Sequence, residues 1–108
     1  MISYAQRISN HAAADPDRAA ITDEHRTVTR AELQSLANRT ARVLAARGVV
    51  EGDNVTIGLP NRIEFVAAVI ACWKLGAVPQ PVSARLPERE LEAIIELANS
   101  KVVVRDVA

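Results

Sequence analysis

The segment Phe65–Trp73 is apolar on nearly every side, and it constrains the fold of this chain more than any other feature. Pro60 and Asn61 precede it and Gly76 follows it, so we predict a helix with Asn61 as its N-cap and Glu64 in a capping box. A helix without a polar face must be buried on most of its sides. Other elements of the chain therefore have to pack around this one.

Helix-like and strand-like segments alternate along the sequence. Further helices are predicted over 3–14, 30–47 and 87–99, the second with a capping box of Thr29 and Glu32 and a left-handed end at Gly48. Strands are predicted over 19–23, 26–28, 54–59, 78–82 and 101–104, the first two as a small hairpin. The alternation predicts an α/β fold of βαβ units, with a largely parallel sheet flanked by helices.

Two of the predicted strands carry further signals. Pro79 and Pro81 interrupt the strand over 78–82, which is typical of an edge strand or of an irregular extended segment. The uninterrupted valines at 102–104 predict a strand that is covered on both faces. Because the sequence stops almost directly after this strand, we expect a fragment whose exposed apolar surface and open strand edge promote self-association.

Composition excludes several classes of protein. A chain of 108 residues is enough for one domain. Its 13 basic and 13 acidic residues cancel, whereas a protein that binds nucleic acid through phosphates needs a basic excess. No apolar run reaches the roughly 20 residues that cross a bilayer, so we expect no membrane span. The single cysteine, Cys72, excludes an internal disulfide, and without a signal-peptide pattern the expected location is the cytoplasm.

No catalytic residue and no metal site can be assigned from the sequence. The four glycines form neither a dinucleotide-binding pattern nor a P-loop. His11 and His25 lie in separate elements, without the spacing of metal ligands. Cys72, inside the apolar helix, is expected to be an inert core thiol, and Asp53 is interpreted as a turn residue.

Arg85 is the candidate ligand-binding residue. It follows a predicted strand and precedes a predicted helix. In open α/β sheets, ligands gather at the carboxyl ends of the strands. The alternative is a surface arginine that pairs with Glu88 or Glu90.

A series of short motifs carries a family resemblance through its order and spacing. The motifs are DPDRAAI at 15–21, TRAEL at 29–33, LANRTARVL at 36–44, GVVEGDNV at 48–55, NRIEFV at 61–66, LGAVP at 75–79 and RL at 85–86. Together they resemble the N-terminal segment of the AMP-forming acyl-CoA synthetases. These enzymes belong to the adenylate-forming superfamily, which includes luciferases and the adenylation domains of peptide synthetases.

The resemblance implies an enzyme that joins a carboxylic acid to coenzyme A, using ATP and Mg²⁺. The carboxylate attacks the α-phosphate of ATP to give an acyl-adenylate and pyrophosphate, and the thiol of CoA then displaces AMP. The family's phosphate-binding loop, ribose-binding aspartate and catalytic lysine have no match here. Residues 1–108 are therefore expected to be a single N-terminal subdomain fragment of a larger AMP-binding domain. The fragment is expected to be inactive alone and to bind none of ATP, Mg²⁺ and CoA tightly. Its partners would be the remainder of the parent enzyme and a small carboxylic acid.

The same resemblance gives Arg85 a specific role. The family's loop at this place often reads Asn-x-Arg-Leu, and in some CoA ligases its arginine lies near the nucleotide end of CoA. Arg85 and Leu86 match this loop, while Ser83 replaces the asparagine. Two other functions stay open: a standalone, non-catalytic α/β module that binds a partner or self-associates, and a fragment of an aminoacyl-adenylating domain that loads a carrier protein.

Overall fold

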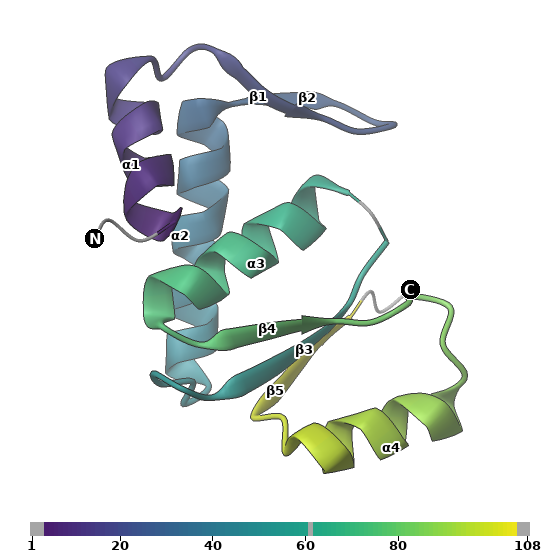
Figure 1. Cartoon of the computed structure of the whole chain (residues 1–108). Helices are drawn as coiled ribbons and strands as arrows, with labels where there is room; N and C mark the ends of the chain where they lie inside the picture. The colour runs from purple at the N-terminus through teal and green to yellow at the C-terminus, as the bar shows by residue number, and fades with distance from the viewer. Residues whose placement is uncertain (1–3, 61, 106–108) are drawn as a thin grey trace.

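The computed structural model describes residues 4–60 and 62–105, and it has the α/β architecture that the alternating segments predict. The elements in chain order are α1 (Tyr4–Ala14), β1 (Ala19–Thr22), β2 (Thr27–Thr29), α2 (Arg30–Ala46), β3 (Asn54–Gly58), α3 (Ile63–Leu75), β4 (Val78–Pro81), α4 (Glu88–Ala98) and β5 (Val102–Arg105). Strands β1 and β2 form the predicted antiparallel hairpin. Figure 1 shows this hairpin beyond the start of α2, away from the main sheet.

The main sheet has the strand order β4-β3-β5, and both pairs are parallel. Strand β4 lies at an edge, as its two prolines predict. The prediction that the valines of β5 are covered on both faces is wrong for the described part of the chain. Val102, Val103 and Val104 are only partly buried, and within that part Val102 and Val104 pack against the core.

Helices α2 and α3 form the core on one face of the sheet, and α4 lies on the other (Figure 1). Alanines of both helices are buried at their contact, so the two backbones can approach closely. Helix α3 also packs Ala71 and Cys72 against Val55 and Ile57 of β3. The apolar helix is thus buried as predicted, except that Trp73 is partly exposed beside the ring of Tyr4, with centroids 5.2 Å apart.

The two predicted capping boxes have different outcomes. Thr29 and Glu32 form the reciprocal hydrogen bonds of a capping box at the start of α2. At α3 the N-cap position is Arg62, which makes no side-chain cap bond, while Asn61 lies outside the described residues. The backbone N–H of Ile63 instead donates to Oδ2 of Asp23, at 3.1 Å. This cap comes from the hairpin turn and cannot be read from the sequence next to the helix.

Within the described ranges, no helix combines the length and the apolar character that crossing a bilayer requires.

Candidate functional site

The sheet topology creates a cleft at the carboxyl ends of the parallel strands. After β3 the chain turns to α3 on one face of the sheet, and after β4 it turns to α4 on the other face (Figure 1). Adjacent strands whose connections diverge in this way leave a crevice outside their carboxyl ends. A cleft of about 770 Å³ lies there, lined by Glu24, Gly58, Leu59, Pro60, Arg62, Val82, Ser83, Ala84, Arg85 and Arg105.

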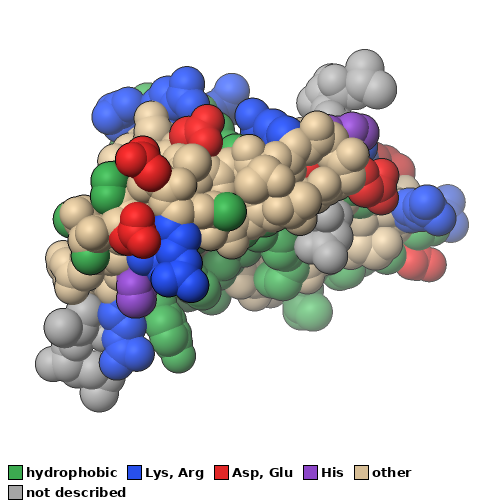
Figure 2. Space-filling model, turned by 90° about the horizontal axis from the view of Figure 1, so that it is seen from above, with side chains coloured by type: hydrophobic (Ala, Val, Ile, Leu, Met, Phe, Trp, Pro, Cys, Tyr) green, Lys and Arg blue, Asp and Glu red, His purple; other side chains and the backbone are tan. Residues whose placement is uncertain are grey.

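Three arginines and one glutamate give the cleft its charge. Arg62 precedes α3, Arg85 lies between β4 and α4, Arg105 ends β5, and Glu24 lies in the hairpin turn. The excess of cations is local, because the net charge of the chain is zero. Figure 2, which shows the molecule from above, has basic and acidic side chains intermixed over the visible face. The cleft therefore suits a small anion better than an extended polyanion.

A tight turn holds the backbone around Arg85. The hydroxyl of Ser83 accepts a hydrogen bond from the N–H of Arg85, and the carbonyl of Ser83 accepts one from the N–H of Leu86, both at 3.2 Å. The serine that replaces the family's asparagine thus serves the loop itself. Among residues 4–60 and 62–105, the guanidinium of Arg85 contacts no hydrogen-bond or ion-pair partner.

Glu88 pairs with Arg105 rather than with Arg85. Two hydrogen bonds join the carboxylate to the guanidinium, at 3.2 and 3.0 Å. The bonds and the opposite charge lower the pKa of Glu88 and raise that of Arg105. The alternative in which Arg85 pairs with Glu88 is therefore wrong, because the fold brings the end of β5 to the start of α4.

The hairpin turn forms one wall of the cleft and is tied to α3. The carboxylate of Asp23 accepts hydrogen bonds from the N–H groups of His25, Arg26 and Ile63, at 2.8, 3.0 and 3.1 Å. These bonds, that of His25 foremost, lower the pKa of Asp23 from 3.8 to about 2. An ion pair of 2.8 Å between Arg26 and Glu64 adds a second link. Together they hold Glu24, which lies between the two links, at the edge of the cleft.

Only part of the role of Asp23 can be predicted from the sequence. Its position before a polar turn is a signal for the local bonds to His25 and Arg26, because aspartate commonly caps its own turn. The bond to Ile63 spans 40 residues and depends on how the hairpin docks on α3. That Arg62 and Arg105 lie beside Arg85 cannot be predicted from the sequence either, since only the assembled sheet brings them to one edge.

The other residues considered from the sequence stay outside the cleft. His11 lies on α1 and His25 in the hairpin turn, both exposed. Asp53 is a turn residue, as interpreted, and its carboxylate accepts the N–H of Val50 at 2.9 Å. Cys72 is fully buried, and burial raises the pKa of its thiol to about 11, as expected of an inert core thiol. The described residues contain no group of three side chains able to hold a metal ion.

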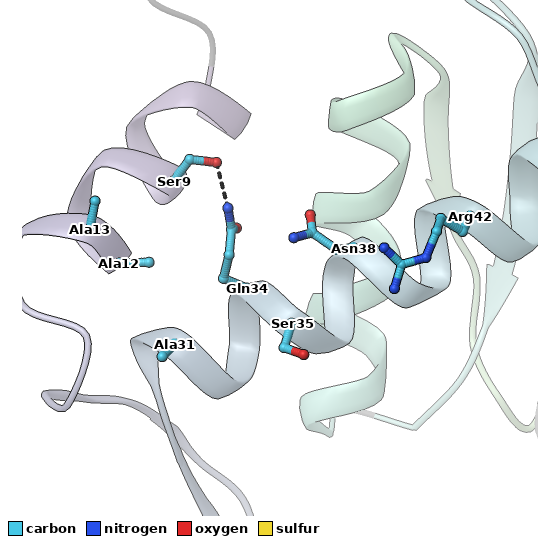
Figure 3. Close-up of a pocket in the computed structure, with 8 residues that line it drawn as sticks. All are labelled: Ser9, Ala12, Ala13, Ala31, Gln34, Ser35, Asn38 and Arg42. Atoms are coloured by element: carbon cyan, nitrogen blue, oxygen red, sulfur yellow. Dashed lines mark hydrogen bonds between the residues drawn. The ribbon is translucent and has the colours of Figure 1, made fainter.

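A second hollow, of about 460 Å³, lies between α1 and α2. Figure 3 shows that the side-chain amide of Gln34 points to Ser9, to which its nitrogen donates at 2.7 Å. Asn38 and Arg42 lie one turn apart on α2, with the guanidinium extended back toward the amide. The hollow carries one charged group, Arg42, against three arginines in the cleft. The strand-end cleft is therefore the stronger candidate site.

The cleft is suited to binding rather than to bond-breaking chemistry. Guanidinium groups bind phosphates and carboxylates through paired N–H donors, and they do not act as bases or nucleophiles at neutral pH. Among the described residues, the lining has no histidine, cysteine or lysine, and the one carboxylate found there, that of Glu24, is exposed. The arrangement can thus hold an anionic ligand at the sheet edge.

The sequence is similar to a family model and to proteins of known name. The family model described as AMP-binding enzyme matches residues 8–108. Long-chain-fatty-acid–CoA ligase FadD13 of Mycobacterium tuberculosis is 42% identical over 77 residues, which are 71% of this chain and 15% of that protein. Tyrocidine synthase 1 of Brevibacillus parabrevis is 33% identical over 110 residues, which cover 96% of this chain and 10% of that protein. The chain thus spans a small part of the length of these relatives.

Solved structures give the same assignment. The inhibitor-bound N-terminal domain of FACL13 from Mycobacterium tuberculosis superposes with a TM-score of 0.89 at 34% identity, over 95% of this chain and 26% of that one. O-succinylbenzoate coenzyme A synthetase (MenE) from Bacillus subtilis, in complex with AMP, gives a TM-score of 0.83 at 36% identity, over 92% of this chain and 26% of that one. The whole arrangement of helices and strands is therefore shared, and not only isolated motifs.

Proposed function

Because the chain belongs to the family of AMP-binding enzymes, we propose that it is the N-terminal subdomain of an AMP-forming ligase that joins a carboxylic acid to CoA. The family match over residues 8–108 carries the proposal. The similarity to FadD13, whose name is that of a CoA ligase, supports CoA as the acceptor. A cytoplasmic location fits the single, buried thiol of Cys72.

The proposed reaction has two steps, and this chain would contribute to the second. In the first step a carboxylate attacks the α-phosphate of ATP, which gives an acyl-adenylate and releases pyrophosphate. In the second step the CoA thiol attacks the acyl carbon and AMP leaves. Arg85 would meet a phosphate of CoA, since it lines the cleft at the strand ends. We assign Mg²⁺ and the phosphates of ATP to the remainder of the enzyme, because the described residues offer no cluster of carboxylates for a cation.

The acceptor thiol decides between this proposal and a second candidate. The second candidate is an adenylating domain that loads a carrier protein instead of CoA, and the similarity to tyrocidine synthase 1, which is not named as a CoA ligase, is what supports it. The protein that carries this sequence at its N-terminus should be incubated with ATP, Mg²⁺ and a panel of fatty, aromatic and sterol-type acids. Release of AMP and pyrophosphate together with an acyl-CoA supports the proposal. Adenylate formation that yields a thioester only on a carrier protein contradicts it.

The 108-residue chain by itself should not exchange pyrophosphate with ATP, whatever the acid. The reason is that the sequence has no match to the family's phosphate-binding loop or catalytic lysine, and no lysine is among the described residues that line the cleft. The measurement is incorporation of labelled pyrophosphate into ATP by the purified chain, with a mock purification as control for contaminating enzyme. Exchange above that control would contradict the assignment of catalysis to the remainder of the enzyme.

A standalone module that self-associates is the third candidate. Strands β4 and β5 are the edges of the described sheet, and Leu97 of α4 is 90% exposed. Open edges and exposed apolar side chains favour association with another copy. Light scattering at high concentration should be measured on both the 108-residue chain and the complete enzyme. The ligase proposal expects the 108-residue chain to associate and the complete enzyme not to associate through this surface.

A further inference from the structure

We propose that Glu88 limits how tightly the strand-end cleft binds phosphorylated ligands, because it holds Arg105 in an ion pair that a ligand phosphate has to break. The class of ligand, a phosphorylated group such as the nucleotide end of CoA, is taken from the proposed function, on which this role of Glu88 rests. The resemblance to the ligases names neither Glu88 nor Arg105. The roles of Glu88 and of Arg105 follow from the contacts between these two residues in this chain.

The geometry places Arg105 between two anions. Its side chain lines the cleft together with Arg85, and two of its N–H groups donate to the carboxylate of Glu88, at 3.2 and 3.0 Å. Paired donation of this kind is also how a guanidinium binds a phosphate. The paired terminal N–H groups that a phosphate would use are therefore the ones that Glu88 already holds.

The ion pair is weak enough to be displaced. The side chains of Arg105 and Glu88 are 43% and 61% exposed, so water screens the attraction between them. A phosphate with two negative charges can take the place of the carboxylate. After displacement, the charge of Glu88 remains near the cleft and repels the ligand. Both effects lower the affinity, and both disappear if Glu88 becomes neutral.

Helix α4 does not depend on this ion pair for its position. The side-chain amide of Asn54 donates to the carbonyl of Ala98 at 2.6 Å, at the other end of the helix. The hydroxyls of Thr56 and Ser100 share a hydrogen bond just beyond that end. Leu91 is buried beneath the first half of α4. Neutralising Glu88 should therefore change the charge of the cleft and leave the fold in place.

The test is a titration of the 108-residue chain with adenosine 3′,5′-bisphosphate, followed by amide NMR, with adenosine as the ligand without phosphates. Glu88→Gln should bind the bisphosphate about two- to five-fold tighter than wild type, which is the range for release of an exposed ion pair. Glu90→Gln removes the same charge from the same helical turn but has no bond to Arg105, and it should change the affinity less than two-fold. In Glu88→Gln/Arg105→Gln the gain should disappear.

Each outcome decides one point. Unchanged or weaker binding in Glu88→Gln overturns the proposal, as does an equal gain in Glu90→Gln, which would make the effect one of general charge. The proposal is also overturned if the bisphosphate causes no chemical-shift changes at the cleft residues of the wild type, provided that dispersed amide resonances show the wild type to be folded. Failure of the ligase function is detected separately, by the acyl-CoA assay. A normal acyl-CoA assay with no effect of Glu88→Gln would refute the role of Glu88 alone.

Discussion

Asp23 shows how one residue can join two elements that are distant in sequence. Its carboxylate completes the hairpin turn through the N–H groups of His25 and Arg26 and caps α3 through that of Ile63. A free N–H at a helix start needs such an acceptor, and negative charge is favourable there. Asp23 therefore acts as a cap of α3 from a distant part of the chain.

The stabilisation by Asp23 should depend on pH. In the unfolded chain Asp23 takes up a proton near its ordinary pKa of 3.8, whereas in the folded chain it does so only near 2. Its contribution is thus complete above about pH 5 and is lost as the pH falls through the folded-state pKa near 2. Asp23→Asn should lower the urea midpoint clearly at pH 7, and the difference from wild type should shrink as the pH falls below about 5 and disappear only below pH 2, where folded Asp23 is itself protonated. Asp17→Asn, at an exposed site, is the control. A difference that does not vary with pH would contradict the role of the charge.

At the scale of elements, the capping box of α2 gives a direct prediction. The hydroxyl of Thr29 accepts the N–H of Glu32 at 3.1 Å, and the carboxylate of Glu32 accepts the N–H of Thr29 at 2.9 Å. Thr29→Ala should lower the free energy of unfolding by about 1 kcal/mol, and Thr29→Ser should be nearly neutral. Chemical denaturation measures both. Equal losses in the two variants would show that the methyl group matters and that the cap does not.

The elements themselves could be predicted because their signals are local. The box of Thr29 and Glu32, the left-handed Gly48 and the prolines of β4 act within a few residues, and each is found where expected. The cap of α3 and the half-exposed valines of β5 could not be predicted, because each depends on which distant segment packs there. The same holds for the site. The loop of Arg85 is a local feature, while its neighbour Arg105 and the partner of Glu88 come from the order of strands in the sheet.

For the whole molecule, the core and the cleft are separate. The side chains that hold α2 and α3 on the sheet, such as Ile57, Ala71 and Cys72, are fully buried. The cleft lies at the strand ends, and its arginines are exposed. Substitutions in the cleft should thus affect ligand binding while the fold is kept. This separation makes Arg85 the residue on which the proposed role of the chain can be tested.

The decisive measurement is the kinetics of Arg85→Ala in the complete enzyme, with the two half-reactions assayed apart. A charge-assisted hydrogen bond to a phosphate, at an exposed site, predicts that the apparent KM for CoA rises roughly ten-fold. The rate of adenylate formation should stay as in wild type, because that step precedes CoA. An unchanged KM for CoA, or equal damage to both half-reactions, would contradict the assignment of the cleft to CoA.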